Sequence, residues 1–156
     1  MKNKKKFSLV LVKPSHYDDD GYVIQWFRSS MPANSLACLY GLAVECDKEK
    51  VLGENVEIEI HAFDEANTHI NTKKITSIIE SADDGMLMLV GVQTNQFPRS
   101  LDIAEPLRAK GIKVVVGGFH VSGVMSMLKE PDNFIQKALD IGVSIFSGEA
   151  EGRLGQ

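Results

Sequence analysis

The chain has 156 residues, 44% of them apolar, and a net charge of −4 at pH 7. This length and composition indicate one globular domain, and the acidic balance argues against a nucleic-acid partner. No stretch approaches the ~20 apolar residues of a membrane span, and the apolar run at 7–12 behind the N-terminal lysines is too short for a secretory signal. We therefore expect a cytoplasmic protein with no membrane partner.

Strand and helix signals alternate through the first half of the chain. Residues 7–12 form an unbroken apolar run, which is typical of a strand covered on both faces. Apolar residues at helical spacing over 36–43 predict a helix, with Asn34 or Ser35 as its N-cap. Residues 56–61 alternate between apolar and charged or polar side chains, which predicts a half-exposed strand at a sheet edge.

Two more elements follow. Asn71 or Thr72 is placed to cap a helix with isoleucines on one face, and residues 86–92 predict another buried strand. Pro98 suits the first turn of the next helix, whereas Pro106 inside it removes a backbone hydrogen bond, so we expect a kink or a late helix start.

The last third of the chain continues the alternation. Gly111 ends the helix, and residues 112–116 form a β-branched strand that leads into a glycine pair. A short helix is expected near Ser122, and a second one capped by Asp132 ends by Gly142. The final strand is expected at 143–146.

Strands joined by helical crossovers predict an α/β fold with a parallel, doubly wound sheet of five strands. Because the second strand has the pattern of an edge and the first, third and fourth are buried, we expect the flavodoxin-like (Rossmann-like) order 2-1-3-4-5. Such a sheet needs a helix over its last strand, but the sequence ends at 151–156, where that helix should begin. We therefore expect a fragment of a longer protein.

Ligands of these sheets bind beyond the carboxyl ends of the strands. The connection after the first strand runs from Lys13 to Pro32, far longer than an ordinary βα loop, and the loops at 91–97, 117–123 and 147–152 are rich in glycine and polar residues. A phosphorylated receiver would need acidic residues directly after the first strand and a lysine after the fifth, which are missing. A flavin-phosphate loop and a dinucleotide-binding G-x-G-x-x-G motif are missing as well.

Four segments stand at these strand ends: KPSHYDDDGY (13–22), LVGVQTN (89–95), VVVGGFHVSG (114–123) and GEAEG (148–152). Together, and in this order, they resemble the N-terminal cobalamin (vitamin B12)-binding domain of radical S-adenosylmethionine proteins. The resemblance covers nearly the whole chain. It implies a corrin cofactor and, as the main partner, the C-terminal radical S-adenosylmethionine domain of the parent chain.

The resemblance also implies which residues contact the cofactor: Ser15, His16, Gln93, Thr94, Asn95, Gly117, Gly118, Phe119, His120, Gly148 and Glu149. His16 is the candidate lower axial ligand of cobalt, although the Asp-x-His-x-x-Gly motif of base-off cobalamin proteins is missing, with Pro14 two residues before it and Asp19 three residues after it. The chain has only Cys38 and Cys46, so the 4Fe-4S cluster and S-adenosylmethionine would belong to the missing domain.

The chain alone is then expected to be catalytically inert, and the parent to be a radical S-adenosylmethionine enzyme, for example a methyltransferase. One alternative is a degenerate domain that has lost cobalamin and serves as a substrate-gating or interaction module. Another is a free-standing small-molecule-binding protein with a flavodoxin-like fold. Purely structural roles also stay open for the glycine pair, for His120 and for the acidic turn at 18–20.

Overall fold

The computed structural model describes residues 4–27 and 33–156. Five parallel strands form one sheet in the order β2-β1-β3-β4-β5, which confirms the predicted flavodoxin-like α/β arrangement. The strands are β1 (Lys5–Lys13), β2 (Val56–Asp64), β3 (Asp84–Leu89), β4 (Lys113–Gly117) and β5 (Ser144–Phe146). The helices are α1 (Asn34–Lys48), α2 (Thr72–Glu80), α3 (Phe97–Arg108), α4 (Phe119–Met127) and α5 (Asn133–Asp140), with a 3-10 turn η1 (Thr94–Gln96) before α3.

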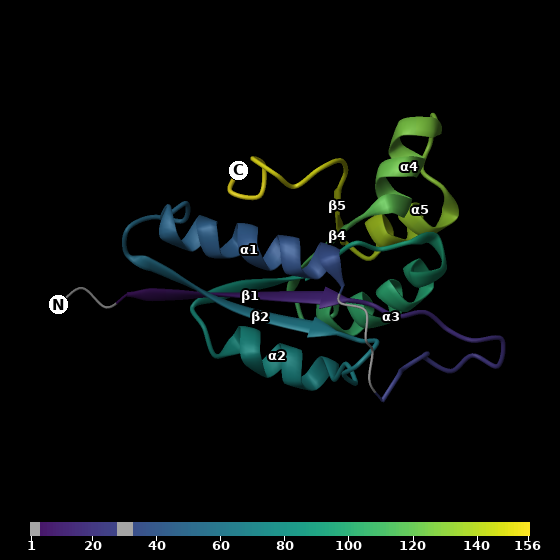
Figure 1. Ribbon diagram of the computed structural model, residues 1–156, viewed down its shortest axis with the longest axis horizontal. Coiled ribbons are helices and arrows are strands. Elements are labelled where there is room, and N and C mark those ends of the chain that lie inside the picture. Colours follow the sequence, from purple (N-terminus) through teal and green to yellow (C-terminus); the bar gives the residue numbers. More distant parts are fainter. Residues whose placement is uncertain (1–3, 28–32) are drawn as a thin grey trace.

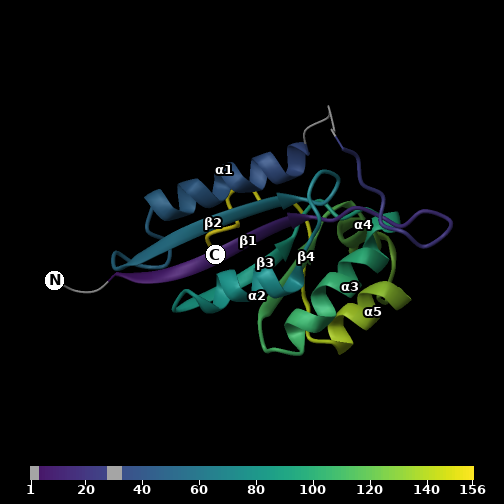
Figure 2. The same cartoon turned by 90° about the horizontal axis from the view of Figure 1, so that it is seen from below.

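The two faces of the sheet are covered unequally. Helices α2, α3 and α5 lie on one face, where they bury the larger hydrophobic core around Val10, Leu87 and Phe97 (Figure 2). Of the segments that the structure describes, the other face carries only α1 and the C-terminal segment 147–156, with Leu154 packed against the smaller core (Figures 1 and 2). Because segment 147–156 forms turns instead of a helix, the α1 side of β3, β4 and β5 is incompletely covered.

Strand β3 ends earlier than the apolar run at 86–92 suggests. The ladder stops at Leu89, and Gly91 takes a φ of 59° that only glycine adopts readily. Beyond the ladder, the Val90 N–H donates to the carbonyl of Val12 and the Val92 N–H donates to that of Gly117. The segment after β3 therefore stays tied to both neighbouring strands while it bends at the carboxyl edge.

Two of the predicted helix caps are confirmed and one is wrong. The side chains of Asn71 and Asp132 accept backbone hydrogen bonds at the starts of α2 and α5. At α1 the N-cap is Ala33, which offers no side-chain hydrogen bond, and Asn34 and Ser35 lie inside the first turn. The cap prediction failed here because α1 starts one residue before the expected helix.

Two further predictions need correction. Helix α3 runs from Phe97 through Pro106 to Arg108, which excludes the late start, while the kink stays a prediction. Pro106 stands close to the C-terminal end, where its missing N–H affects only the last turn. Helix α4 begins at Phe119 and not near Ser122, since Gly118 bends the backbone directly after β4 with a φ of 138°.

Cys38 is exposed and Cys46 is half-buried, and both are free thiols. Within residues 4–27 and 33–156, no helix has the length and apolarity needed to cross a bilayer.

Candidate functional site

A cavity of about 230 Å³ lies where the sheet is incompletely covered. Helix α1 forms one wall, the α1 side of β3 and β4 forms the floor, and the C-terminal segment closes the far side. Its apolar lining includes Leu39, Met88, Val90, Val115, Phe146 and Leu154. Ser35, Cys38, Glu149 and Glu151 add polar groups. The cavity can therefore enclose an apolar group with a polar end.

Several residues that the sequence singled out meet at this cavity. Gly117 and Gly118 line it from the end of β4, and Gly148 and Glu149 line it from the segment after β5. Gly91 lies at its edge nearest α1. Three loops that are far apart in the sequence thus contribute to one site at the carboxyl end of the sheet.

The glycine pair also has a purely structural explanation. A Cβ atom on Gly118 would lie 2.2 Å from the backbone nitrogen of Val92, and one on Gly117 would lie 3.2 Å from the carbonyl oxygen of Phe146. Gly118 further adopts a φ of 138°, which side-chain-bearing residues rarely adopt. Close packing against the segment after β3 therefore requires Gly118 whether or not a ligand binds.

His120 and Thr94 point elsewhere. The His120 ring is buried in α4, where its Nδ1 lies 3.1 Å from Thr94 Oγ1 and its centroid lies 4.8 Å from that of Phe97. Its Nε2 lies 3.0 Å from an Asp132 carboxylate oxygen but outside hydrogen-bond geometry, so the contact becomes a favourable ion pair when the imidazole is protonated. His120 thus packs between α3, α4 and the start of α5 and does not line the cavity.

Gln93, Asn95 and Phe119 are exposed at the carboxyl edge of the sheet. The Phe119 side chain is 77% exposed, and other large apolar side chains are exposed on α4 and on the connection after β1. They include Tyr22, Trp26, Met127 and Leu128. We call the exposed side chains of Tyr22, Trp26, Phe119, Met127 and Leu128 the apolar rim. The connection after β1 and α4 both lie at this end of the molecule in the two ribbon views (Figures 1 and 2).

The described part of the first connection is a small hairpin. Tyr17 and Val23 form an antiparallel bridge, and the Asp18 carboxylate accepts the N–H groups of Asp20 and Tyr22, so the acidic run is a turn. Ser15 is buried and its hydroxyl donates to the Ile24 carbonyl. The part of this connection that runs on to Pro32 includes 28–32, which lie outside the described residues.

His16 is half-buried at the base of this hairpin. Its backbone carbonyl accepts the Ile24 N–H, and no carboxylate in the described part of the chain is paired with its imidazole. Three or more His, Cys, Asp and Glu side chains do not gather into a metal-binding group anywhere in the described ranges. The protein groups that the structure describes therefore do not complete a metal site at His16.

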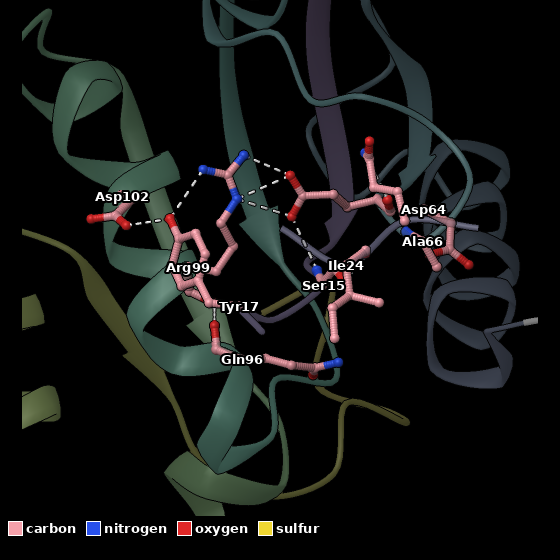
Figure 3. A network of polar contacts seen from close by, with 11 residues as sticks. Ser15, Tyr17, Ile24, Asp64, Ala66, Gln96, Arg99 and Asp102 are labelled. Atoms are coloured by element: carbon pink, nitrogen blue, oxygen red, sulfur yellow. Dashed lines mark hydrogen bonds and ion pairs between the residues drawn. The ribbon is translucent and has the colours of Figure 1, made fainter. Parts of the chain in front are cut away.

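A buried ion pair anchors the hairpin, and no sequence pattern indicated it (Figure 3). Glu65, at the end of β2, is fully buried, and its carboxylate accepts from Arg99 on α3 at 2.6 Å and from the Ser15 N–H at 3.0 Å. The Tyr17 hydroxyl donates to Asp102, and burial together with this hydrogen bond raises the pKa of Tyr17. The network therefore joins the first connection to β2 and α3.

Lys13 was also missed as a site residue. It is the last residue of β1, and its ammonium group donates to the Gly91 carbonyl and, at 2.7 Å, to Gln96 Oε1. Burial lowers the pKa of Lys13 from 10.5 to about 8. One signal in the sequence could have identified it: a charged residue ends an apolar central strand, at the point where the strand order of the sheet reverses.

No known protein family, curated protein or solved structure matches the chain in the three comparisons made. Any functional conclusion therefore depends on the residues described above.

Proposed function

We propose that this chain is a cobalamin-binding domain, with the corrin at the carboxyl edge of the sheet and the nucleotide tail of the cofactor in the cavity. The observation that carries the proposal is the convergence of Gly117, Gly118, Gly148 and Glu149 on that cavity. These residues come from two of the segments that resemble cobalamin-binding domains, and the resemblance itself did not require them to share a cavity.

The size and lining of the cavity fit a ligand whose nucleotide tail lies inside it and whose corrin lies outside. Its volume of about 230 Å³ lies below the range of about 300–1,000 Å³ typical of pockets that enclose a whole drug-sized molecule. It accommodates one ring system with its linker, so the larger, flat corrin would lie outside it, at the carboxyl edge of the sheet. Bound cobalamin would supply the cobalt chemistry, while the residues of this chain would bind and orient the cofactor.

We do not assign His16 to cobalt in this proposal. A ligating imidazole is normally oriented by a carboxylate on its other nitrogen, and His16 has no such partner among the described residues. The reaction would be carried out by a radical S-adenosylmethionine domain of the parent protein, which would hold the 4Fe-4S cluster and S-adenosylmethionine.

The test is a titration with hydroxocobalamin, followed by desalting and measurement of the corrin absorbance that the protein retains. A Cys38→Trp variant places a bulky ring at an exposed position that lines the cavity. The matched control is Tyr40→Trp, which changes an exposed residue of the same helix that does not line it. We expect the wild type and Tyr40→Trp to retain corrin and Cys38→Trp to bind at least about tenfold more weakly, a loss of about 1.4 kcal/mol.

Equal retention by both variants would contradict the placement of the tail in the cavity. Loss of corrin from the wild type itself, with the fold intact by circular dichroism, would reject cobalamin binding by this chain. That second result would favour the degenerate-domain alternative, in which the apolar rim serves protein–protein contact, a use consistent with its exposed aromatic side chains.

A further inference from the structure

Lys13 lies on the same side of the sheet as the cavity. Side chains alternate along β1, and Leu9 and Leu11 pack into the core beneath α1, so Lys13 also faces α1. Its ammonium group contacts the carbonyl of Gly91, a residue of the cavity wall. The side chain thus reaches the edge of the cavity, at the junction of β1 and β3.

The ammonium group has neutral partners only. It donates to the Gly91 carbonyl and to Gln96 Oε1, which also accepts the Gln93 N–H at 3.0 Å. Asp64 lies close enough to act on Lys13 electrostatically, but no ion pair joins Lys13 to a carboxylate within residues 4–27 and 33–156. A largely buried cation without a counter-ion is unfavourable, and the lowered pKa of Lys13 has the same cause, burial.

The ammonium group retains binding capacity. It has three N–H donors and the two contacts above use two of them. The Ser35 hydroxyl, in the first turn of α1, flanks the same glycine: a Cβ atom on Gly91 would lie 2.3 Å from Ser35 Oγ and 3.5 Å from Lys13 Nζ. A charged donor and a neutral donor therefore lie beside Gly91 at the cavity wall, and the Ser35 side chain takes the space that a Cβ atom on Gly91 would need.

We propose that Lys13 Nζ and Ser35 Oγ bind a phosphate group of the ligand whose apolar part occupies the cavity. The inference rests on the proposed function in taking this cavity as the ligand site, and there the group is the phosphodiester of the nucleotide tail. A phosphate suits this pair because lysine binds phosphate as a compact point charge and a hydroxyl adds one hydrogen bond. The phosphate would also supply the counter-ion that Lys13 lacks.

The test compares a benzimidazole ribonucleotide with the matching ribonucleoside by isothermal titration calorimetry on the full chain. The two probes differ only in the phosphate. We expect the wild type to bind the ribonucleotide at least about tenfold more tightly, which is the effect of one charge-assisted hydrogen bond. In Lys13→Met this preference should disappear while the affinity for the ribonucleoside stays the same.

Lys113→Met is the matched control, because Lys113 pairs with Asp84 at the opposite end of the sheet. It should leave the preference unchanged. Lys13→Arg should keep part of it, and Ser35→Ala, a change at a half-buried position, should weaken it even if Lys13→Met does not fold.

Equal affinity of the wild type for the two probes, or a preference that survives in Lys13→Met, would overturn the inference. The inference would also be overturned if neither the ribonucleotide nor inorganic phosphate bound to the wild type. These outcomes are separate from the corrin experiment. Corrin retention without a Lys13-dependent preference would refute only this inference. A Lys13-dependent preference without corrin retention would refute only the cobalamin proposal.

Discussion

Replacing Arg99 with methionine tests whether the Glu65–Arg99 pair holds the first connection against the sheet. The Glu65 side chain is 1% exposed and that of Arg99 is 15% exposed, so the pair is well shielded from water. Removing the guanidinium leaves a buried carboxylate whose remaining hydrogen-bond donor among the described residues is the Ser15 N–H. We therefore expect Arg99→Met to lose about 3–5 kcal/mol of unfolding free energy, as for other broken buried ion pairs.

The assay is urea unfolding at pH 7.5, followed by circular dichroism. The free energy of unfolding comes from the midpoint and the slope of each transition.

Arg108→Met is the matched control. Arg108 is on the same helix, is half-buried and donates to backbone carbonyls of Ile112 and Ile141, with no carboxylate partner in the described residues. It should cost about 1–3 kcal/mol. If Arg99→Met lost less than about 1 kcal/mol, or no more than Arg108→Met, the buried ion pair would not be the anchor that we describe.

Three further predictions concern single positions. Gly118→Ala should lower the free energy of unfolding in urea by about 3 kcal/mol or more, because the new Cβ meets the Val92 nitrogen. The control Gly123→Ala, with open space in α4, should change it by at most about 1 kcal/mol. Similar values for both would refute the packing argument. Asn71→Ala should destabilise the protein by about 1 kcal/mol through loss of the α2 cap, and an unchanged urea midpoint would contradict that role. Burial lowers the folded-state pKa of Lys13 to about 8, so the unfolded chain holds more protons between about pH 8 and 10.5. The stability of the wild type relative to Lys13→Met should therefore rise with pH in that window. Parallel urea midpoints of the two proteins at pH 7.5 and 9.5 would exclude the shift in pKa.

The residues that the motifs indicated fall into two groups, those that line the cavity and those that do not. Gly117, Gly118, Gly148 and Glu149 were identified from short motifs and share a cavity. His120 belongs to the same motif as the glycines, yet it is directed into the packing between helices. One residue of helical rotation separates exposed Phe119 from buried His120, and a motif does not record that rotation.

The sequence by itself determined the local elements and their order in the sheet. The alternation in β2 follows from an edge position with one face toward α1, and Asn71 and Asp132 cap helices through bonds that reach only three residues along the chain. Apolar runs identify central strands because both of their faces are covered. All of these signals are short-range, so they are legible without any knowledge of the packing.

Only the tertiary structure decided which distant residues meet. Glu65 and Arg99 are 34 positions apart, and Lys13 and Gly91 are 78 apart, and nothing in either local pattern marks them as partners. The cavity likewise arises from a helix face, three strand ends and a returning segment, whose separations depend on how the layers pack. Periodicity reports which side of an element avoids water, whereas a binding site depends on distances between elements, and those are set by packing of the whole domain.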